Sequence, residues 1–253
     1  MGAGPGGKSL KDVRNGALLQ MLEAATLGMP FEVWKTRMGR FRTESTVQAF
    51  RNVYASGGAP AFWAGTSAKM VESATKGAVL MVSKERINDA ARAAGVSPFL
   101  SGIVAGAGGG VCQVVVMGPC TYLVTATVTG ADQSRSILAI ARETFAKAGV
   151  RGFYPGGTAI AFRQATNWAS RQGFTEKSRE VIAAAAHGDK QAKLSVSQEA
   201  AAGVVGGALA CWNHPFEVAR IEAQARAAAG QPSLSMMAVF RQVVAENGVR
   251  GLF

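Results

Sequence analysis

The amino-acid sequence predicts an all-α membrane protein of three tandem repeats, each about 90–100 residues long. Charged residues make up only 17% of the 253 residues, against ~25% in an ordinary soluble domain. The mean hydropathy is +0.14 although the formal net charge is +11. A stretch of 39 residues, 93–131, contains no Asp, Glu, Lys or Arg. The chain also matches itself when it is shifted by 91 and then by 99 residues.

These observations predict a single domain over residues 1–253. Residues 1–9 are polar and glycine-rich, with no apolar run of the length that a signal peptide needs, and are expected to form a flexible tail. The first repeat is expected over 10–92, the second over 93–185, and an incomplete third over 186–253.

The uncharged stretch 93–131 predicts a membrane span, because a bilayer helix needs only ~20 mostly apolar residues. Its glycine cluster at 106–110 breaks the dinucleotide-binding pattern at Val111. Small residues that let membrane helices approach closely explain the cluster better. A second uncharged stretch, 200–216, carries Gly203, Gly206 and Gly207 and predicts another small-residue packing helix.

Two further segments, 66–89 and 157–180, are long enough to span but carry several Lys, Arg and Glu residues. Taken alone, each fits a soluble amphipathic helix. Charges at membrane depth usually face a bundle interior or a water-filled cavity. Because the uncharged stretch lies between them, a shared helix bundle around a polar lumen is the better interpretation, and it predicts a solute path.

The repeat appears as aligned residues around a short helix. The aligned positions are Val47, Leu138 and Met237; Arg51, Arg142 and Arg241; Tyr54, Phe145 and Val244; Gly58, Gly149 and Gly248; Phe62, Phe153 and Leu252. Within each repeat the first and the third of these positions, for example Val47 and Tyr54, are seven residues apart, which is typical of one face of an amphipathic helix. Each repeat should therefore contain a short surface helix followed by a turn with glycine and an aromatic or apolar residue.

A proline motif lies upstream of each surface helix: PFEVWK at 30–35, PCTYLV at 119–124 and PFEVAR at 215–220. Proline inside a helix removes a backbone hydrogen bond and bends the axis. In the first and third motifs an acid and a base stand three residues apart, and residues with that spacing share a helix face.

These motifs and the threefold register resemble the mitochondrial carrier family over nearly the whole sequence. The resemblance implies two transmembrane helices per repeat, joined by an amphipathic helix on the matrix side, in the mitochondrial inner membrane. It assigns a matrix gate to Pro30, Glu32, Lys35, Pro119, Pro215, Glu217 and Arg220. It assigns a gate on the cytoplasmic side to Glu85, Glu176 and Arg179.

The segment FRQATNW at 162–168, with PFEVWKTR at 30–37, is similar to the tricarboxylate branch of that family. The resemblance implies that Lys76, Arg163, Gln164 and Arg171 hold the carboxylates of the solute. Arginine suits this role because its planar fork binds a carboxylate with two hydrogen bonds. The net charge also favours anionic lipid, such as cardiolipin, as a partner.

Other function classes fit the sequence poorly. The two histidines, His187 and His214, have no Cys or His at metal-ligand spacing, so neither an enzyme nor a metal site is expected, and no cofactor is implied. The basic residues are spread over all repeats, which argues against a nucleic-acid binder.

The chain departs from the family pattern in three places. The second motif has Thr121 and Val124 where an acid and a base are expected, and Leu80 replaces an arginine of the tricarboxylate pattern. Phe253 falls on the turn of the third repeat, so a sixth transmembrane helix is expected to be missing. Two hypotheses follow: a carrier exchanging citrate or related di- and tricarboxylates, which we favour, or a degenerate carrier serving as a non-transporting subunit of an inner-membrane, respiratory-type complex. In the second, a partner subunit would fill the place of the sixth helix.

Overall fold

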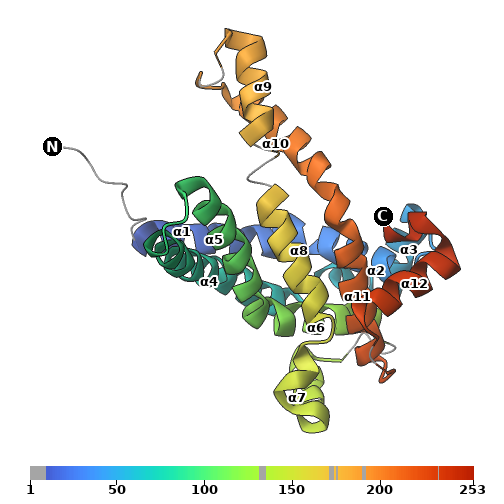
Figure 1. The fold of residues 1–253 in the computed structure, drawn as a ribbon. Helices are drawn as coiled ribbons and strands as arrows, with labels where there is room; N and C mark the ends of the chain where they lie inside the picture. Colours follow the sequence, from blue (N-terminus) through green and yellow to red (C-terminus); the bar gives the residue numbers. More distant parts are fainter. Residues whose placement is uncertain (1–9, 131–134, 171–173, 175, 190–191, 233) are drawn as a thin grey trace.

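The computed structural model describes residues 10–130, 135–170, 174, 176–189, 192–232 and 234–253, and within them the fold is helical without strands (Figure 1). The α-helices are, in chain order, α1 (Leu10–Glu23), α2 (Met29–Arg40), α3 (Thr46–Gly57), α4 (Thr66–Ala93), α5 (Pro98–Cys112), α6 (Val114–Thr129), α7 (Ile137–Ala148), α8 (Gly157–Ser170), α9 (Glu176–His187), α10 (Val196–Leu209), α11 (His214–Ala228) and α12 (Met236–Asn247).

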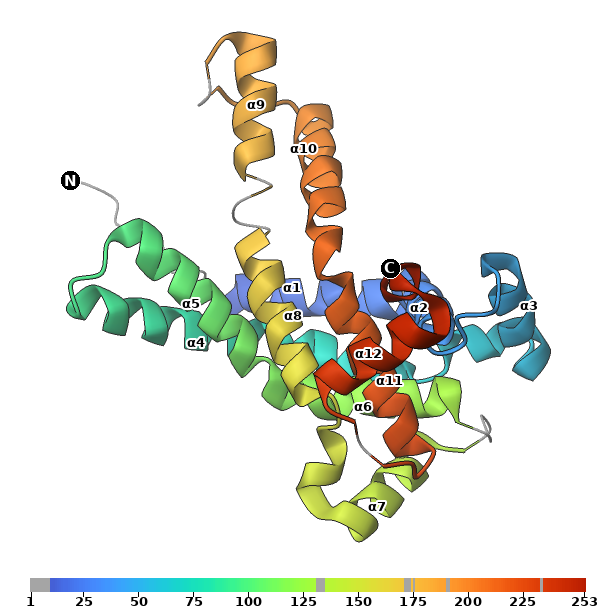
Figure 2. The ribbon, with the colours of Figure 1, turned by 45° about the vertical axis from the view of Figure 1, so that its right-hand side comes forward.

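Helices from all three repeats meet at the centre of the structure. The long helix α4 packs along α5 and against α6, and α5 packs in turn against α8. Helix α11 contacts α2, α6, α8 and α12, so the third repeat touches both of the others. Helices α9 and α10 lie side by side and extend away from this centre (Figure 2).

A break in the helix precedes each signature proline. A π-helical turn, Ala24–Gly28, leads into α2 just before Pro30. Helices α5 and α6 meet at a 44° bend, six residues before Pro119, and a 3₁₀ turn, Ala210–Asn213, comes before Pro215. Proline lacks the N–H and its ring clashes with the carbonyl four residues earlier, so the disturbance falls on its N-terminal side. The described residues thus show a helix break before each of the three prolines and a 44° bend before the second; bending at Pro30 and Pro215 stays a prediction.

The expected long helices are found in part. The segment predicted over 66–89 is the single helix α4. Of the segment predicted over 157–180, the described residues form α8 up to Ser170 and the start of α9 from Glu176. In the part of the chain that the structure describes, α5 and α6 together have the length and apolarity of a membrane span with a bend in it, and no helix has both by itself.

The three short helices α3, α7 and α12 share their end structures, as the repeat predicts. The hydroxyls of Ser45, Ser136 and Ser235 each accept a hydrogen bond from the backbone N–H three residues later, which caps the helix. At the other end stand Gly58, Gly149 and Gly248, with φ of 69°, 58° and 69°, where other residues would be strained. The apolar residues two positions after each cap are 56–63% exposed.

Small residues pack helices together along α5, and in α10 only some of them are buried, among them Ala202 and Gly206. A Cβ added to Gly110 would lie 2.7 Å from Trp168 Cδ1, and one added to Gly108 would lie 2.7 Å from Ile87 Cδ1. The predicted close packing is therefore confirmed for Gly108, Gly109 and Gly110, whereas a Cβ added to Gly106 would meet nothing within 4 Å among the described residues. The prediction was wrong for Gly203 and Gly207, which have nothing within 4 Å of an added Cβ among the described residues.

An apolar cluster joins the first repeat to α6. Met29 and Val33 of α2 pack with Phe62 and with Val124 of α6, all at most 6% exposed. This cluster holds α2 and α6 in fixed positions beside the polar centre described next.

Candidate functional site

A polar cavity of about 260 Å³ lies where the three repeats meet. Its lining comprises Glu32, Lys35, Lys69, Glu72, Lys76, Gln113, Met117, Thr121, Arg163, Gln164, Asn167, Trp168, Glu217 and Arg220. Five of these side chains are basic and three are acidic. The cavity is smaller than the ~300–1,000 Å³ typical of pockets for drug-sized ligands, so its size suits a small anion.

One end of the cavity is closed by ion pairs between α2 and α11. Lys35 Nζ lies 2.9 Å from Glu32 Oε2 in its own helix and 3.0 Å from Glu217 Oε1 in α11. Arg220 donates two hydrogen bonds of 2.8 Å to Glu217 and lies 3.9 Å from Glu32. The acid and base of each motif thus pair within their own helix, and the first and third motifs are also linked to each other. Losing one partner of a pair buried on both sides, such as Glu217 with Arg220, typically costs about 3–5 kcal/mol.

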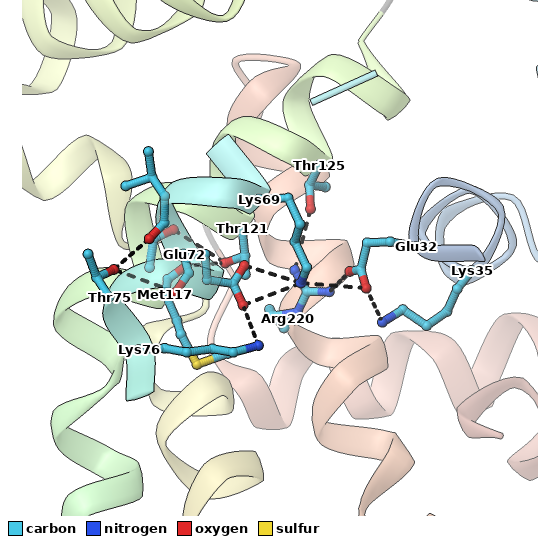
Figure 3. Close-up of polar contacts among 12 residues, drawn as sticks. Glu32, Lys35, Lys69, Glu72, Thr75, Lys76, Met117, Thr121, Thr125 and Arg220 are labelled. Atoms are coloured by element: carbon cyan, nitrogen blue, oxygen red, sulfur yellow. Dashed lines mark hydrogen bonds and ion pairs between the residues drawn. The ribbon is translucent and has the colours of Figure 1, made fainter. Parts of the chain in front are cut away.

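A second row of charges comes from α4 (Figure 3). Lys69, Glu72 and Lys76 are three and four residues apart, so they share one helix face. Glu72 is 1% exposed and lies 3.3 Å from Lys69 Nζ and 4.0 Å from Lys76 Nζ. Lys69 also lies 3.8 Å from Glu32, which connects this row to the α2–α11 pairs.

The second proline motif and the turn after it contribute hydroxyl groups instead of charges. Gln224 of α11 donates to Thr121 Oγ1 at 2.9 Å and accepts from Thr125 Oγ1 at 2.9 Å. Arg220 also donates to Gln224 Oε1, at 2.8 Å. Val124, at the expected position of the base, is 2% exposed in the apolar cluster and does not line the cavity. Only the acidic position of the second motif therefore faces the polar centre.

Three of the four residues predicted to hold solute carboxylates line the cavity: Lys76, Arg163 and Gln164. Arg163 Nε lies 3.2 Å from Glu217, so this arginine also contacts the closing pairs. Arg171, the fourth, lies outside the described residues. The cavity thus combines the first and third motifs with residues of α4 and α8.

The residues predicted for the cytoplasmic-side gate lie elsewhere. Glu85 is exposed on α4, and Glu176 is the first residue of α9. Arg179 pairs with Glu199 of α10 at 2.8 Å. A gate formed by these three residues stays a prediction.

Sequence reasoning missed two parts of the centre. Glu222, 2% exposed, accepts from Arg40 at 2.8 Å and lies 3.4 Å from Arg42, which adds a second ionic contact between α11 and the end of α2. Gln113 lines the cavity at the bend between α5 and α6. The sequence does mark Gln113, because it is the one amide side chain in the uncharged stretch 93–131.

A second hollow, of about 500 Å³, lies between α2, α11 and the chain end at Phe253. Its lining includes Phe31, Trp34, Val218 and Ile221, which are apolar. The polar cavity is therefore the better candidate for binding an anion.

Comparison with known proteins agrees with this arrangement. The family described as "Mitochondrial carrier protein" matches residues 7–93, 95–185 and 192–253, which supports three repeats. The chain is 32% identical over 256 residues to the "Citrate/oxoglutarate carrier protein" of Saccharomyces cerevisiae (strain ATCC 204508 / S288c). That match covers 97% of this chain and 82% of the relative. The chain belongs to the mitochondrial carrier family.

Proposed function

We propose that this protein exchanges citrate or a related di- or tricarboxylate across the mitochondrial inner membrane by alternating access. The observation that carries the proposal is the lining of the central cavity, where five basic side chains stand against three acidic ones. A formal excess of two positive charges favours an anion with two or three carboxylates over a neutral or cationic solute.

The carboxylate contacts are assigned to Arg163 and Lys76, which line the cavity from α8 and α4. Arg163 can bind a carboxylate through two N–H groups, whereas Lys76 acts as a point charge. The name of the yeast relative gives citrate and oxoglutarate as the first solutes to test.

The α2–α11 ion pairs are proposed to be the matrix gate. Lys35 and Glu217 close the cavity at one end, and Arg163 touches the same carboxylate. A solute carboxylate that binds Arg163 would compete with Glu217 for it. Binding would thereby weaken the closing contacts, which couples the solute to the opening of the gate.

Two observations support the proposed location in a membrane: the chain belongs to the mitochondrial carrier family, and the central helices carry exposed apolar side chains. Val71 of α4, Leu100 of α5, Val115 of α6 and Phe162 of α8 are 52–66% exposed. Apolar side chains in such positions suit a lipid environment. We further propose that the basic excess of the chain attracts anionic lipid.

The test is exchange in proteoliposomes loaded with citrate or 2-oxoglutarate, with labelled citrate outside. Arg163→Ala is expected to reduce uptake at least tenfold. The matched control is Arg142→Ala, an exposed arginine of the second repeat on α7, which should keep uptake within twofold.

Unchanged uptake by Arg163→Ala would remove this residue from the site. If the folded wild-type protein takes up none of these acids, the transport proposal fails. The non-transporting subunit would then become the better hypothesis.

A further inference from the structure

Gln113 connects the binding residues of the first and second repeats. It is 4% exposed at the bend between α5 and α6. Its Nε2 donates to the backbone carbonyl of Lys76 in α4 at 2.8 Å. Its Oε1 accepts from Gln164 Nε2 at 2.8 Å and from Trp168 Nε1 at 3.4 Å, both in α8.

The orientation of the Gln113 amide is fixed by what its neighbours can do. A backbone carbonyl can only accept a hydrogen bond, and an indole N–H can only donate one. The NH₂ group of Gln113 must therefore face Lys76, and its oxygen must face Trp168. The reversed amide would place the NH₂ group of Gln113 against the indole N–H of Trp168, where two donors would meet. It would also place the Gln113 oxygen against the backbone carbonyl of Lys76, where two acceptors would meet.

This orientation determines that of the Gln164 amide in turn. Because Gln113 offers its oxygen, Gln164 must point its NH₂ group at Gln113. The contact is close because Gly110 in α5 lets α8 approach: an added Cβ would lie 3.1 Å from the Gln164 backbone oxygen. A side chain at residue 110 would push the two amides apart.

Gln164 consequently offers its carbonyl oxygen to the cavity that it lines. Within the described part of the chain, no residue donates a hydrogen bond to this oxygen. The other groups nearby that bind anions, Arg163 and Lys76, are donors. The cavity therefore combines donors for carboxylates with an amide acceptor, the Gln164 oxygen, which can take a solute O–H group beside Arg163; the three carboxylates in the lining are already paired with Lys or Arg side chains.

We infer that Gln113 is a specificity-determining residue, which holds Gln164 as an acceptor and so favours acids that carry a hydroxyl group beside their carboxylates. This inference rests on the proposed function, because it assumes that carboxylates bind in the cavity. Gln113 acts through Gln164 and is thus a positioning residue.

The test compares citrate with tricarballylate, which has the same three carboxylates but no hydroxyl group. Uptake into proteoliposomes gives the ratio of kcat/KM for the two acids, and this ratio, rather than the absolute rate, is the readout. Wild-type protein should prefer citrate about three- to tenfold, the effect of one hydrogen bond. A merely structural defect would lower both rates together.

Three variants separate the roles of the two amides. Gln113→Leu should bring the ratio close to one, mainly by raising KM for citrate. Gln113→Glu keeps an acceptor for Gln164 and should retain most of the preference, although its charge lowers uptake of both acids. In the double variant Gln113→Leu with Gln164→Leu, the second change should shift the ratio no further, because both remove the same interaction.

A Gln113→Leu protein that transports citrate with the wild-type ratio would overturn the inference and leave the proposed function intact. Thermal stabilisation of the purified protein by each acid, measured in detergent, provides a readout without transport. If neither acid stabilises the wild type, both the proposed function and the role of Gln113 are contradicted. If the wild type binds these acids without transporting them, only transport is contradicted. The ratio of its affinities for citrate and tricarballylate then tests the role of Gln113.

Gln113→Leu also removes the hydrogen bond to Lys76 and could prevent folding. Gln164→Leu alone then replaces it, because it removes the acceptor and leaves the hydrogen bond from Gln113 to Lys76 in place. Its ratio should be close to one. A ratio equal to that of the wild type would contradict the inference.

Discussion

Lys35 of α2 and Glu217 of α11 form an ion pair at 3.0 Å that joins the first repeat to the third across the central cavity. The Lys35 side chain is 38% exposed, whereas that of Glu217 is only 3% exposed. A buried carboxylate is costly without its cations. Helix α11 can therefore move away from α2 only if Glu217 keeps Arg163 and Arg220 or gains another partner.

Replacement of these two residues should reveal a coupled pair. Lys35→Met and Glu217→Gln are each expected to lower the Tm of the detergent-solubilised protein by several degrees. The double variant should lose less than the sum, with a coupling free energy of about 0.5–3 kcal/mol. Thermal unfolding of the four proteins at one pH and salt concentration measures this cycle.

Lys147→Met is the matched control for Lys35. Lys147 also pairs with a glutamate, Glu143, but its side chain is 73% exposed on α7. Exposed pairs contribute only ~0–1 kcal/mol, so the Tm should stay within about two degrees. Strictly additive effects of Lys35→Met and Glu217→Gln would show that the pair does not couple the repeats.

Glu222 should stabilise the same closed arrangement from the far end of α2. Glu222→Gln removes the charge that holds Arg40 at 2.8 Å and Arg42 at 3.4 Å. Because the carboxylate is buried and the arginines remain, we expect a loss of roughly 1–3 kcal/mol. If the closed state is the one stabilised, maximal exchange at saturating citrate should rise while the Tm falls.

The control for Glu222 is Glu143→Gln. Glu143 also holds two cations, Arg135 and Lys147, but it lies on the exposed helix α7 and is itself 37% exposed. Its loss should change neither Tm nor exchange appreciably. Slower exchange by Glu222→Gln, without faster turnover under any condition, would contradict a role in closure.

Contacts within one turn of helix could be predicted from the sequence pattern, whereas contacts between repeats at the gate residues were expected only from the family resemblance. The pair of Glu32 with Lys35 follows from their spacing of three residues. The serine caps and glycine ends of α3, α7 and α12 follow from the repeat, because capping is local chemistry. By contrast, Arg40 meets Glu222 only because α2 and α11 pack together.

The cavity itself was predicted in outline. Lys76, Arg163 and Gln164 were expected there from the resemblance to the tricarboxylate branch, and all three line it. Gln113 was missed because an amide in an apolar stretch could equally be a packing residue. Its partners became visible only when α4 and α8 were placed beside it.

The structure revises one prediction that the sequence of the second signature motif suggests. The sequence suggests that Thr121→Glu together with Val124→Lys would restore a missing pair and stabilise the closed state. Val124 instead lies in the apolar cluster with Met29 and Phe62, and its Cα would lie 3.2 Å from a Cβ added to Gly65. A lysine there would be buried without a partner.

Val124→Lys is therefore expected to destabilise the protein severely, by more than about 4 kcal/mol, or to prevent its folding. Thr121→Glu alone places a carboxylate at the cavity and should be tolerated, with weaker citrate uptake because it competes for the cations. Val150→Lys, at an exposed position of the turn after α7, should leave Tm unchanged. A stable Val124→Lys protein would show that this side chain can reach the cavity.

A pH-dependent contribution is expected from Glu44, in the segment between α2 and α3. Glu44 accepts hydrogen bonds from Arg37 at 2.9 and 2.7 Å and from Asn52 at 2.8 Å. The hydrogen bonds from Arg37 are the main reason that the pKa of this carboxyl lies below its ordinary value. In the unfolded chain the pKa returns to ~4.3.

Folding therefore favours the ionised form of Glu44, and its contribution to stability is complete above pH ~4.3 and is lost as the pH falls through the folded-state pKa. Glu44→Gln removes this contribution, so its Tm should be lower than that of the wild type at pH 7. The difference should shrink as the pH is lowered from about 5 to 3, because protonated glutamate resembles glutamine. Thermal unfolding of both proteins across this range measures the difference. A gap that stays constant down to pH 3 would mean that packing, rather than the charge of Glu44, joins α2 to α3.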